Sequence, residues 1–211
     1  ISKIATARKK TVAVRIPKHK VARNLLKILK VPLAAPSANI ASKLSPTSAK
    51  DVVDEFGNKI KLILDGGQCK IGLESTIIDL TVKPTILRPG SISAEKIQKI
   101  LKKKVTINNN PKKIKGPGQL KLHYSPGIPV IMNRKYPEKN QAFIGFGKKF
   151  KLGKNNFNLS KNGSLKEAAN NLYKIMRKIK KKKFKSIAVT QIPNIELGRA
   201  INDRLIKASN R

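Results

Sequence analysis

One segment of the sequence loses the apolar pattern that a folded core requires. The composition shifts at Lys102, and residues 102–127 are rich in Lys, Asn, Pro and Gly without helical or strand periodicity. Such a composition is typical of a linker. The chain of 211 residues is long enough for two small units, each with its own core. We therefore expect units at residues 1–104 and 128–211, joined by a linker at residues 105–127.

Segments typical of strands and helices alternate in the first unit. Apolar and β-branched runs predict strands at residues 11–16, 31–35, 62–64, 76–80 and 85–88. Apolar residues on one helical face predict helices over residues 18–30, 45–56 and 93–101. Ser45, which precedes Pro46, is expected to cap the second of these helices, and Ser93 the third.

Strands and helices also alternate in the second unit. Short apolar runs predict strands at residues 130–132, 142–146 and 187–190. Ser164 and Glu167 form a capping-box pattern that opens one helix, and a further helix is predicted over residues 197–208. This alternation is typical of an α/β fold with a largely parallel sheet, here a small Rossmann-like domain.

The charge of the chain favours polyanionic partners. It has 47 basic and 11 acidic residues, a net charge of +36, which would attract RNA phosphates. AT-rich codons would enrich Lys, Asn and Ile without any function, so the charge permits RNA binding without requiring it. Cys69 is the only cysteine and suits a reducing compartment. No apolar run approaches the roughly 20 residues of a membrane helix, no signal peptide is visible, and we expect a cytoplasmic protein.

Two motifs place an arginine at the end of a predicted strand. In TVAVR (residues 11–15), the Arg15 guanidinium could bind a carboxylate through two hydrogen bonds, and the Thr11 hydroxyl could hydrogen-bond to a nucleotide. In LRPG (residues 87–90), the turn could aim Arg88 at a phosphate. Taken alone, each motif more often marks a surface arginine, at the end of a buried strand in TVAVR and beside a turn in LRPG.

Two further motifs bring small and hydroxyl side chains. The small residues of APSAN (residues 35–39) would let a ligand approach the backbone, with hydrogen-bonding groups from Ser37 and Asn39. Ser75 of LESTI stands where a strand begins, either lining a pocket or at a sheet edge. Ser45 could serve a phosphate as well as the helix cap, because helix N-termini suit phosphates.

The order of the motifs adds what no single motif supplies. TVAVRIP, LAAPSAN, SPT, DGG, GLESTI and ILRPG follow one another in the first 90 residues. The series resembles the YrdC-like family, specifically the threonylcarbamoyl-AMP synthases. PGQLKLHYSP is similar to the inter-domain segment of that family, and GRAINDRL (residues 198–205) to its long-form C-terminal domain. The resemblance implies the C-terminal part of a YrdC-like twisted-sheet domain, a linker and a small α/β domain.

The resemblance also implies a reaction and its partners. The family condenses L-threonine, bicarbonate and ATP into threonylcarbamoyl-adenylate and pyrophosphate, and a downstream enzyme transfers the threonylcarbamoyl group to tRNA. On the matching positions, Arg15, Ala35 (through its backbone) and Ser75 would hold threonine. ATP would be held by the side chains of Thr11, Ser37, Ser45, Arg88 and Tyr124, with Asn39 a weaker candidate.

The residues themselves indicate how such a reaction would be catalysed. No Ser-His-Asp or Cys-His set is evident, so we expect no catalytic side chain in the narrow sense and catalysis by positioning and charge stabilisation. Mg²⁺ is expected to accompany the ATP phosphates, without a dedicated protein metal site.

One family element is not found, and two other readings stay open. The family's Lys-x-Arg phosphate element does not appear, and the chain begins at Ile1. We therefore expect a truncated catalytic domain and no turnover by this chain alone. One alternative is a non-catalytic RNA-binding protein with a degenerate nucleotide pocket. The other is a YrdC-like module from a carbamoyl-transfer enzyme of hydrogenase maturation, which the HYSP and GRAINDRL segments disfavour.

The end of the linker does not resemble a plain tether. Residues 116–126 combine Pro and Gly with the rings of His123 and Tyr124. One interpretation is a lid over the pocket of the first unit, with Tyr124 touching the nucleotide and water excluded. The other is that His123 and Tyr124 staple the two units together.

Overall fold

The computed structural model describes residues 1–211 except 5, 109–110, 112–113, 151 and 211. The parts of the predicted linker at 109–110 and 112–113 therefore lie outside the described residues. Among the described residues, no helix is both long and apolar enough to cross a membrane.

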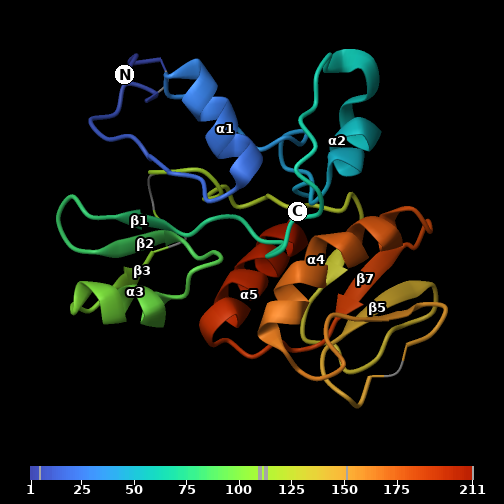
Figure 1. Cartoon of the computed structure of the whole chain (residues 1–211). Coiled ribbons are helices and arrows are strands. Elements are labelled where there is room, and N and C mark those ends of the chain that lie inside the picture. The colour runs from blue at the N-terminus through green and yellow to red at the C-terminus, as the bar shows by residue number, and fades with distance from the viewer. Residues whose placement is uncertain (5, 109–110, 112–113, 151, 211) are drawn as a thin grey trace.

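The first part of the chain holds three α-helices and a small sheet (Figure 1). Its elements in order are α1 (Lys20–Leu29), α2 (Ala49–Phe56), a 3₁₀ turn η1 (Gly57–Lys59), β1 (Ile77–Asp79), β2 (Thr85–Arg88), α3 (Ala94–Leu101) and β3 (Thr106–Ile107). β1 pairs with β2 antiparallel, and β3 pairs with β2 in parallel. The predicted strands at 76–80 and 85–88 are confirmed, as are the helices at 18–30 and 93–101.

The second part is an α/β unit with an all-parallel sheet, as predicted. Its elements are β4 (Val130–Ile131), β5 (Gln141–Gly145), β6 (Asn156–Asn158), α4 (Leu165–Lys180), β7 (Ser186–Val189) and α5 (Glu196–Ser209), with strand order β4-β7-β5-β6. The pairs β4–β7, β5–β7 and β5–β6 are all parallel. β6 was not predicted from the sequence.

The two long helices of the second unit lie between its sheet and the first part of the chain (Figure 1). α4 buries one face against the sheet, including Leu172, Met176 and Ile179, at the helical spacing expected from the sequence. The same core cluster contains Leu44 of the first part and Tyr124 of the linker. The core of the second unit therefore extends across the boundary between the two parts.

Three predicted strands are wrong. Residues 11–16, 31–35 and 62–64 are in no strand. A strand needs a neighbour to take up its backbone hydrogen bonds, and no described residue pairs with these segments in a ladder. Val14 is 84% exposed and Ile16 is 94% exposed, so the apolar pattern that predicted a buried strand lies on the surface.

The start of α2 was also predicted wrongly. The helix begins at Ala49, with Ser48 as its N-cap: the Ser48 hydroxyl accepts from the Asp51 N–H at 3.2 Å. The Asp51 carboxylate in turn accepts from the Thr47 N–H at 2.7 Å, which closes the turn before the helix. Ser45 lies outside the helix, and its hydroxyl is used elsewhere. The predicted caps Ser93 and Ser164 are confirmed.

Candidate functional site

Three predicted site residues meet where β1 begins and β2 ends. Arg15 Nη1 donates to Ser75 Oγ at 3.0 Å. Arg88 donates to the Ser75 carbonyl from Nε at 3.1 Å and from Nη2 at 2.8 Å. The antiparallel register sets Ile77 opposite Arg88, so the residue two positions before Ile77 reaches the arginine that ends β2. Two guanidinium groups thus converge on one serine.

The glycine of the LRPG turn permits this arrangement. A side chain on Gly90 would put its Cβ 2.4 Å from the Glu74 carbonyl and 2.5 Å from the Ser75 carbonyl carbon. The backbone of Ser91 donates to the same Glu74 carbonyl at 3.0 Å. The turn after β2 therefore packs directly on the backbone of the LESTI segment.

Glu74 is a central residue of the site that was not predicted from the sequence. Its Oε1 accepts from Ser45 Oγ at 2.5 Å and from the Tyr173 hydroxyl at 2.9 Å, and its Oε2 accepts from Arg204 Nε at 2.8 Å. Burial alone would raise the pKa of this carboxyl. The Arg204 charge and the hydrogen bonds from Ser45 and Arg204 outweigh burial and lower the pKa from 4.5 to about 2. A glutamate shortly before the apolar start of β1 was the signal that could have indicated a buried partner.

The partner of Glu74 comes from the second unit. The Arg204 side chain is 1% exposed, and its Nη1 also donates to Asp203 Oδ2 at 2.6 Å. Asp203 accepts a further bond from Lys207 Nζ at 2.6 Å. Asp203 and Arg204 belong to the GRAINDRL segment, so that motif supplies a buried ionic cluster of α5 facing the LESTI segment.

Tyr124 is buried between the two parts. It is 1% exposed; its ring centroid lies 6.1 Å from that of Tyr173 and 4.8 Å from the Arg204 Cζ. Burial raises the pKa of the Tyr124 hydroxyl to about 12. Burial disfavours the charged form of His123 as well, and so lowers the pKa of its imidazole. His123 Nδ1 accepts from the Tyr124 N–H at 2.9 Å. These contacts fit the staple interpretation of the linker.

The same segment also lies against a predicted nucleotide residue. Gly118, at φ +78°, is so close to the site that a Cβ there would lie 2.6 Å from Tyr124 Oη and 2.7 Å from Arg88 Cδ. Gln119 is 4% exposed, and its Nε2 donates to the Leu87 carbonyl at 3.0 Å. The linker therefore covers the end of β2 and brings Tyr124 and Arg88 to the same glycine.

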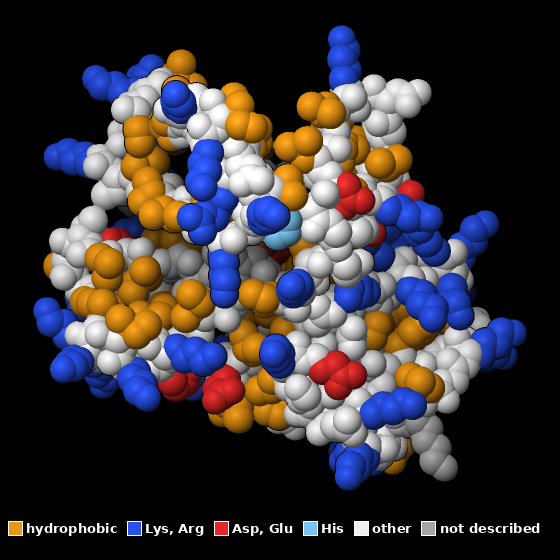
Figure 2. Space-filling view, viewed as in Figure 1, with side chains coloured by type: hydrophobic (Ala, Val, Ile, Leu, Met, Phe, Trp, Pro, Cys, Tyr) orange, Lys and Arg blue, Asp and Glu red, His pale blue; other side chains and the backbone are white. Residues whose placement is uncertain are grey.

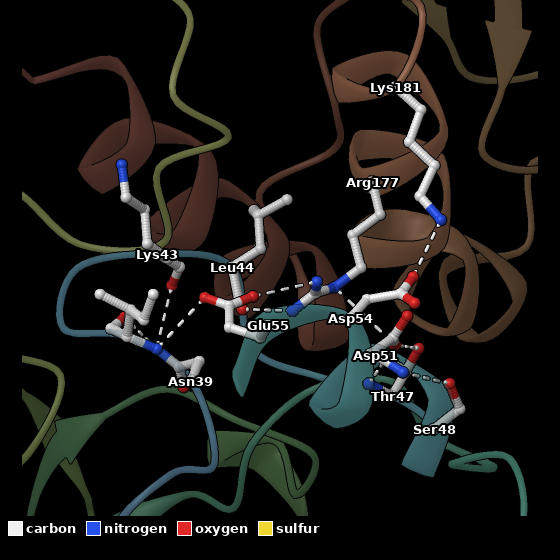
Figure 3. Close-up of polar contacts among 11 residues, drawn as sticks. Asn39, Lys43, Leu44, Thr47, Ser48, Asp51, Asp54, Glu55, Arg177 and Lys181 are labelled. Carbon is white, nitrogen blue, oxygen red and sulfur yellow. Dashed lines mark hydrogen bonds and ion pairs between the residues drawn. The ribbon is translucent and has the colours of Figure 1, made fainter. Parts of the chain in front are cut away.

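The APSAN loop is held by hydrogen bonds of Asn39, but its predicted site residues Ala35 and Ser37, like Thr11, lie apart from Arg15 and Arg88. Asn39 Nδ2 donates to the carbonyls of Ile40 at 2.8 Å and Lys43 at 3.3 Å. Figure 3 shows this loop beside α2, where Arg177 reaches in from α4. In the part of the chain that the structure describes, Thr11, Ala35 and Ser37 are exposed and form no hydrogen bond to Arg15, Ser75 or Arg88.

The arrangement is suited to binding anions. Guanidinium groups bind carboxylates and phosphates through paired hydrogen bonds. Lysines and arginines are spread over the face seen in Figure 2, with few acidic side chains among them. No cluster of three His, Cys, Asp or Glu side chains able to hold a metal occurs among the described residues.

Two family profiles together match almost the whole chain. The profile described as "Telomere recombination" matches residues 1–90, and the profile of the threonylcarbamoyl-AMP synthase C-terminal domain matches residues 92–210. Three curated relatives, all named threonylcarbamoyl-AMP synthase, are similar to the chain. The Pyrococcus abyssi protein is 35% identical over 99% of this chain and 67% of the relative. The Bacillus subtilis protein is 31% identical over 99% and 66%. The Schizosaccharomyces pombe protein is 43% identical over 66% and 37%.

Solved structures agree with these relatives. The chain superposes on a crystal structure of the P. abyssi Sua5 protein complexed with L-threonine, with a TM-score of 0.88 and 33% identity over 99% of this chain and 67% of that one. A variant structure of the same protein gives a TM-score of 0.86. The chain thus spans about two thirds of the length of its P. abyssi and B. subtilis relatives. On its sequence and its fold, it belongs to the threonylcarbamoyl-AMP synthase family.

Proposed function

We propose that the protein synthesises threonylcarbamoyl-AMP from L-threonine, bicarbonate and ATP, with release of pyrophosphate. The observation that carries this proposal is the convergence of Arg15 and Arg88 on Ser75, with hydrogen bonds of 2.8–3.1 Å. Two cations at one serine suit a site that receives an amino-acid carboxylate next to a nucleotide phosphate. The P. abyssi relative was crystallised in complex with L-threonine, which supports threonine as the amino acid.

Each predicted residue then has a role in the proposal. Arg15 pairs with the threonine carboxylate, while Ser75 and the Ala35 backbone bind the rest of the amino acid. Arg88 binds an ATP phosphate, and Mg²⁺ accompanies the phosphates. The remaining ATP contacts are assigned to Thr11, Ser37, Ser45 and Tyr124. The buried Ser45 is already oriented by its 2.5 Å hydrogen bond to Glu74. Catalysis would consist of holding the reactants in position and stabilising charge, without a covalent intermediate on the protein.

The test is substrate omission. Pyrophosphate release from ATP, Mg²⁺, L-threonine and bicarbonate is measured for the purified 211-residue chain and for any longer form of the protein. Turnover is expected from the longer form only, because the Lys-x-Arg phosphate element of the family is not found in this sequence. The proposal expects release to fall to background when threonine or bicarbonate is omitted. Release that needs ATP alone would indicate an ATPase and contradict the proposal.

The wider setting follows from the same proposal. The product would be used in the cytoplasm by an enzyme that transfers the threonylcarbamoyl group to tRNA, and the net charge of +36 favours weak RNA contact. Such contact should weaken steeply with salt and show little sequence preference. Salt-insensitive binding would exclude this electrostatic account. Of the basic run at 180–183, Lys181 lies 3.0 Å from Asp54 and is already paired within the protein.

A further inference from the structure

Arg177 of the second unit binds the loop at residues 30–48, which contains Leu44 and Ser45. Its Nη2 donates to the Leu44 carbonyl at 2.7 Å, and its Nη1 donates to Glu55 Oε2 at 3.3 Å (Figure 3). The other oxygen of the Glu55 carboxylate accepts from the Ile40 N–H at 3.2 Å. One arginine of α4 therefore fixes this loop at two points, directly at Leu44 and through Glu55 at Ile40.

Arg204 binds the next residue of the same loop indirectly. Its Nε lies 2.8 Å from Glu74 Oε2, and Glu74 Oε1 accepts from Ser45 Oγ at 2.5 Å. Successive residues, Leu44 and Ser45, are thus held by arginines from two different helices of the second unit. Ser45 is one of the residues assigned to ATP.

The loop has little regular structure of its own. In the described part of residues 30–48, the only bridge pairs Lys43 with Ser125 of the linker. The Ser125 N–H also donates to the Ser42 carbonyl at 2.8 Å. The bonds of Asn39 within the loop join near neighbours only. The placement of the loop therefore depends on α2, the linker and the second unit.

The burial of these contacts separates them from ordinary surface pairing. The Arg177 and Glu55 side chains are 14% and 7% exposed, and Arg204 is 1% exposed. Lys181, directly after α4, pairs with Asp54 of α2 as Arg177 pairs with Glu55 of α2. Its side chain, however, is 69% exposed and that of Asp54 is 39% exposed. Lys181 therefore contributes to the interface without touching the loop, and solvent screens its charge.

We propose that Arg177 and Arg204 are positioning residues for the loop at residues 30–48, so that a task of the second unit is to hold Leu44 and Ser45 in the geometry that binds ATP. This inference rests on the proposed function. It gives the second unit a role in nucleotide affinity that is separate from threonine recognition at Arg15, Ser75 and the Ala35 backbone. Arg177 contacts the loop at Leu44 and, through Glu55, at Ile40, and not at Ala35.

The test compares matched variants by isothermal titration with ATP and Mg²⁺ and, separately, with L-threonine. Arg177→Met should raise the Kd for ATP about tenfold and leave the Kd for threonine within about twofold. Lys181→Met, which removes a cation from the same helix–helix contact, should change neither. Arg177→Lys keeps the charge but cannot reach both Leu44 and Glu55, and should give an intermediate Kd for ATP.

The outcomes are distinguishable. If the unchanged protein binds neither ATP nor threonine, the proposed function fails and this inference fails with it. If it binds both and Arg177→Met binds ATP normally, or loses ATP and threonine affinity in equal measure, only the inference is overturned. Should Arg177→Met not fold, Arg177→Lys decides. For Arg204, the effects of Arg204→Lys and Ser45→Ala on ATP affinity should be less than additive, and additive effects would contradict action through Ser45.

Discussion

Arg204 of α5 and Glu74 of the LESTI segment form a buried ion pair between the two units, with Nε and Oε2 2.8 Å apart. Breaking a buried pair by removing one partner leaves an uncompensated charge. We expect Arg204→Met to lower the free energy of unfolding by about 3–5 kcal/mol, measured by urea denaturation. Arg199→Met, which removes the more exposed pair with Glu95, should lower it by no more than about 1 kcal/mol.

The same pair predicts a dependence of stability on pH. The pKa of Glu74 is lowered from 4.5 to about 2, so the folded state binds this proton more weakly than the unfolded state. The stabilisation is therefore complete above about pH 4.5 and is lost as the pH falls toward 2. Glu74→Gln should flatten the decline of unfolding free energy in this window relative to the unchanged protein. Parallel curves for the two proteins would show that Glu74 does not contribute.

Gly72 provides a test of how the LESTI segment packs on α4. At φ +80°, its Cβ would lie 2.6 Å from the Ala169 carbonyl and 2.6 Å from Asn170 Cα. Gly67 has a similar φ of +78° with nothing within 4 Å. Both substitutions to Ala incur the left-handed strain of about 1–2 kcal/mol, but Gly72→Ala should cost about 1–3 kcal/mol more through overpacking. Equal midpoints in urea would contradict the close approach.

Arg15 tests the threonine site. If it pairs with the threonine carboxylate in a desolvated site, Arg15→Ala should weaken threonine binding by roughly 2–5 kcal/mol and affect ATP binding far less. Calorimetric titration with each ligand measures both. Arg134→Ala, which removes an exposed arginine of the second unit, is the matched control. Unchanged threonine affinity in Arg15→Ala would remove Arg15 from the site.

Tyr124→Phe separates the two interpretations of the linker. Among the described residues, the buried Tyr124 hydroxyl has no hydrogen-bond partner, so its removal should change stability by less than about 1 kcal/mol. If the hydroxyl contacts the nucleotide, the affinity for ATP should fall severalfold in the same variant. An unchanged affinity for ATP in Tyr124→Phe would leave only the interpretation that Tyr124 holds the two units together.

The sequence predicted best those elements whose partners are nearby in the chain. Ser93 and Ser164 cap helices through local hydrogen bonds, and the parallel sheet of the second unit followed from alternating patterns. Residues 11–16 and 62–64 have the apolar pattern of strands, but a strand exists only where another strand accepts its hydrogen bonds. Sequence pattern carries no information on that neighbour.

The candidate site shows the same division. The motifs indicated Arg15, Ser75 and Arg88, and the structure brings these three together. The role of Glu74 could not be read from its own segment, because its partner Arg204 is 130 residues away. Long-range pairing of this kind depends on how two units pack, which local pattern does not encode.

Leu44 and Tyr124 lie in the same buried cluster as the core side chains of α4, α5 and their sheet. Neither residue can leave that cluster without exposing apolar surface of the second unit to water. The unfolding of the loop, the linker and the second unit is therefore thermodynamically linked. A calorimetric scan should show them melting in one cooperative transition, with the calorimetric enthalpy equal to the van't Hoff enthalpy.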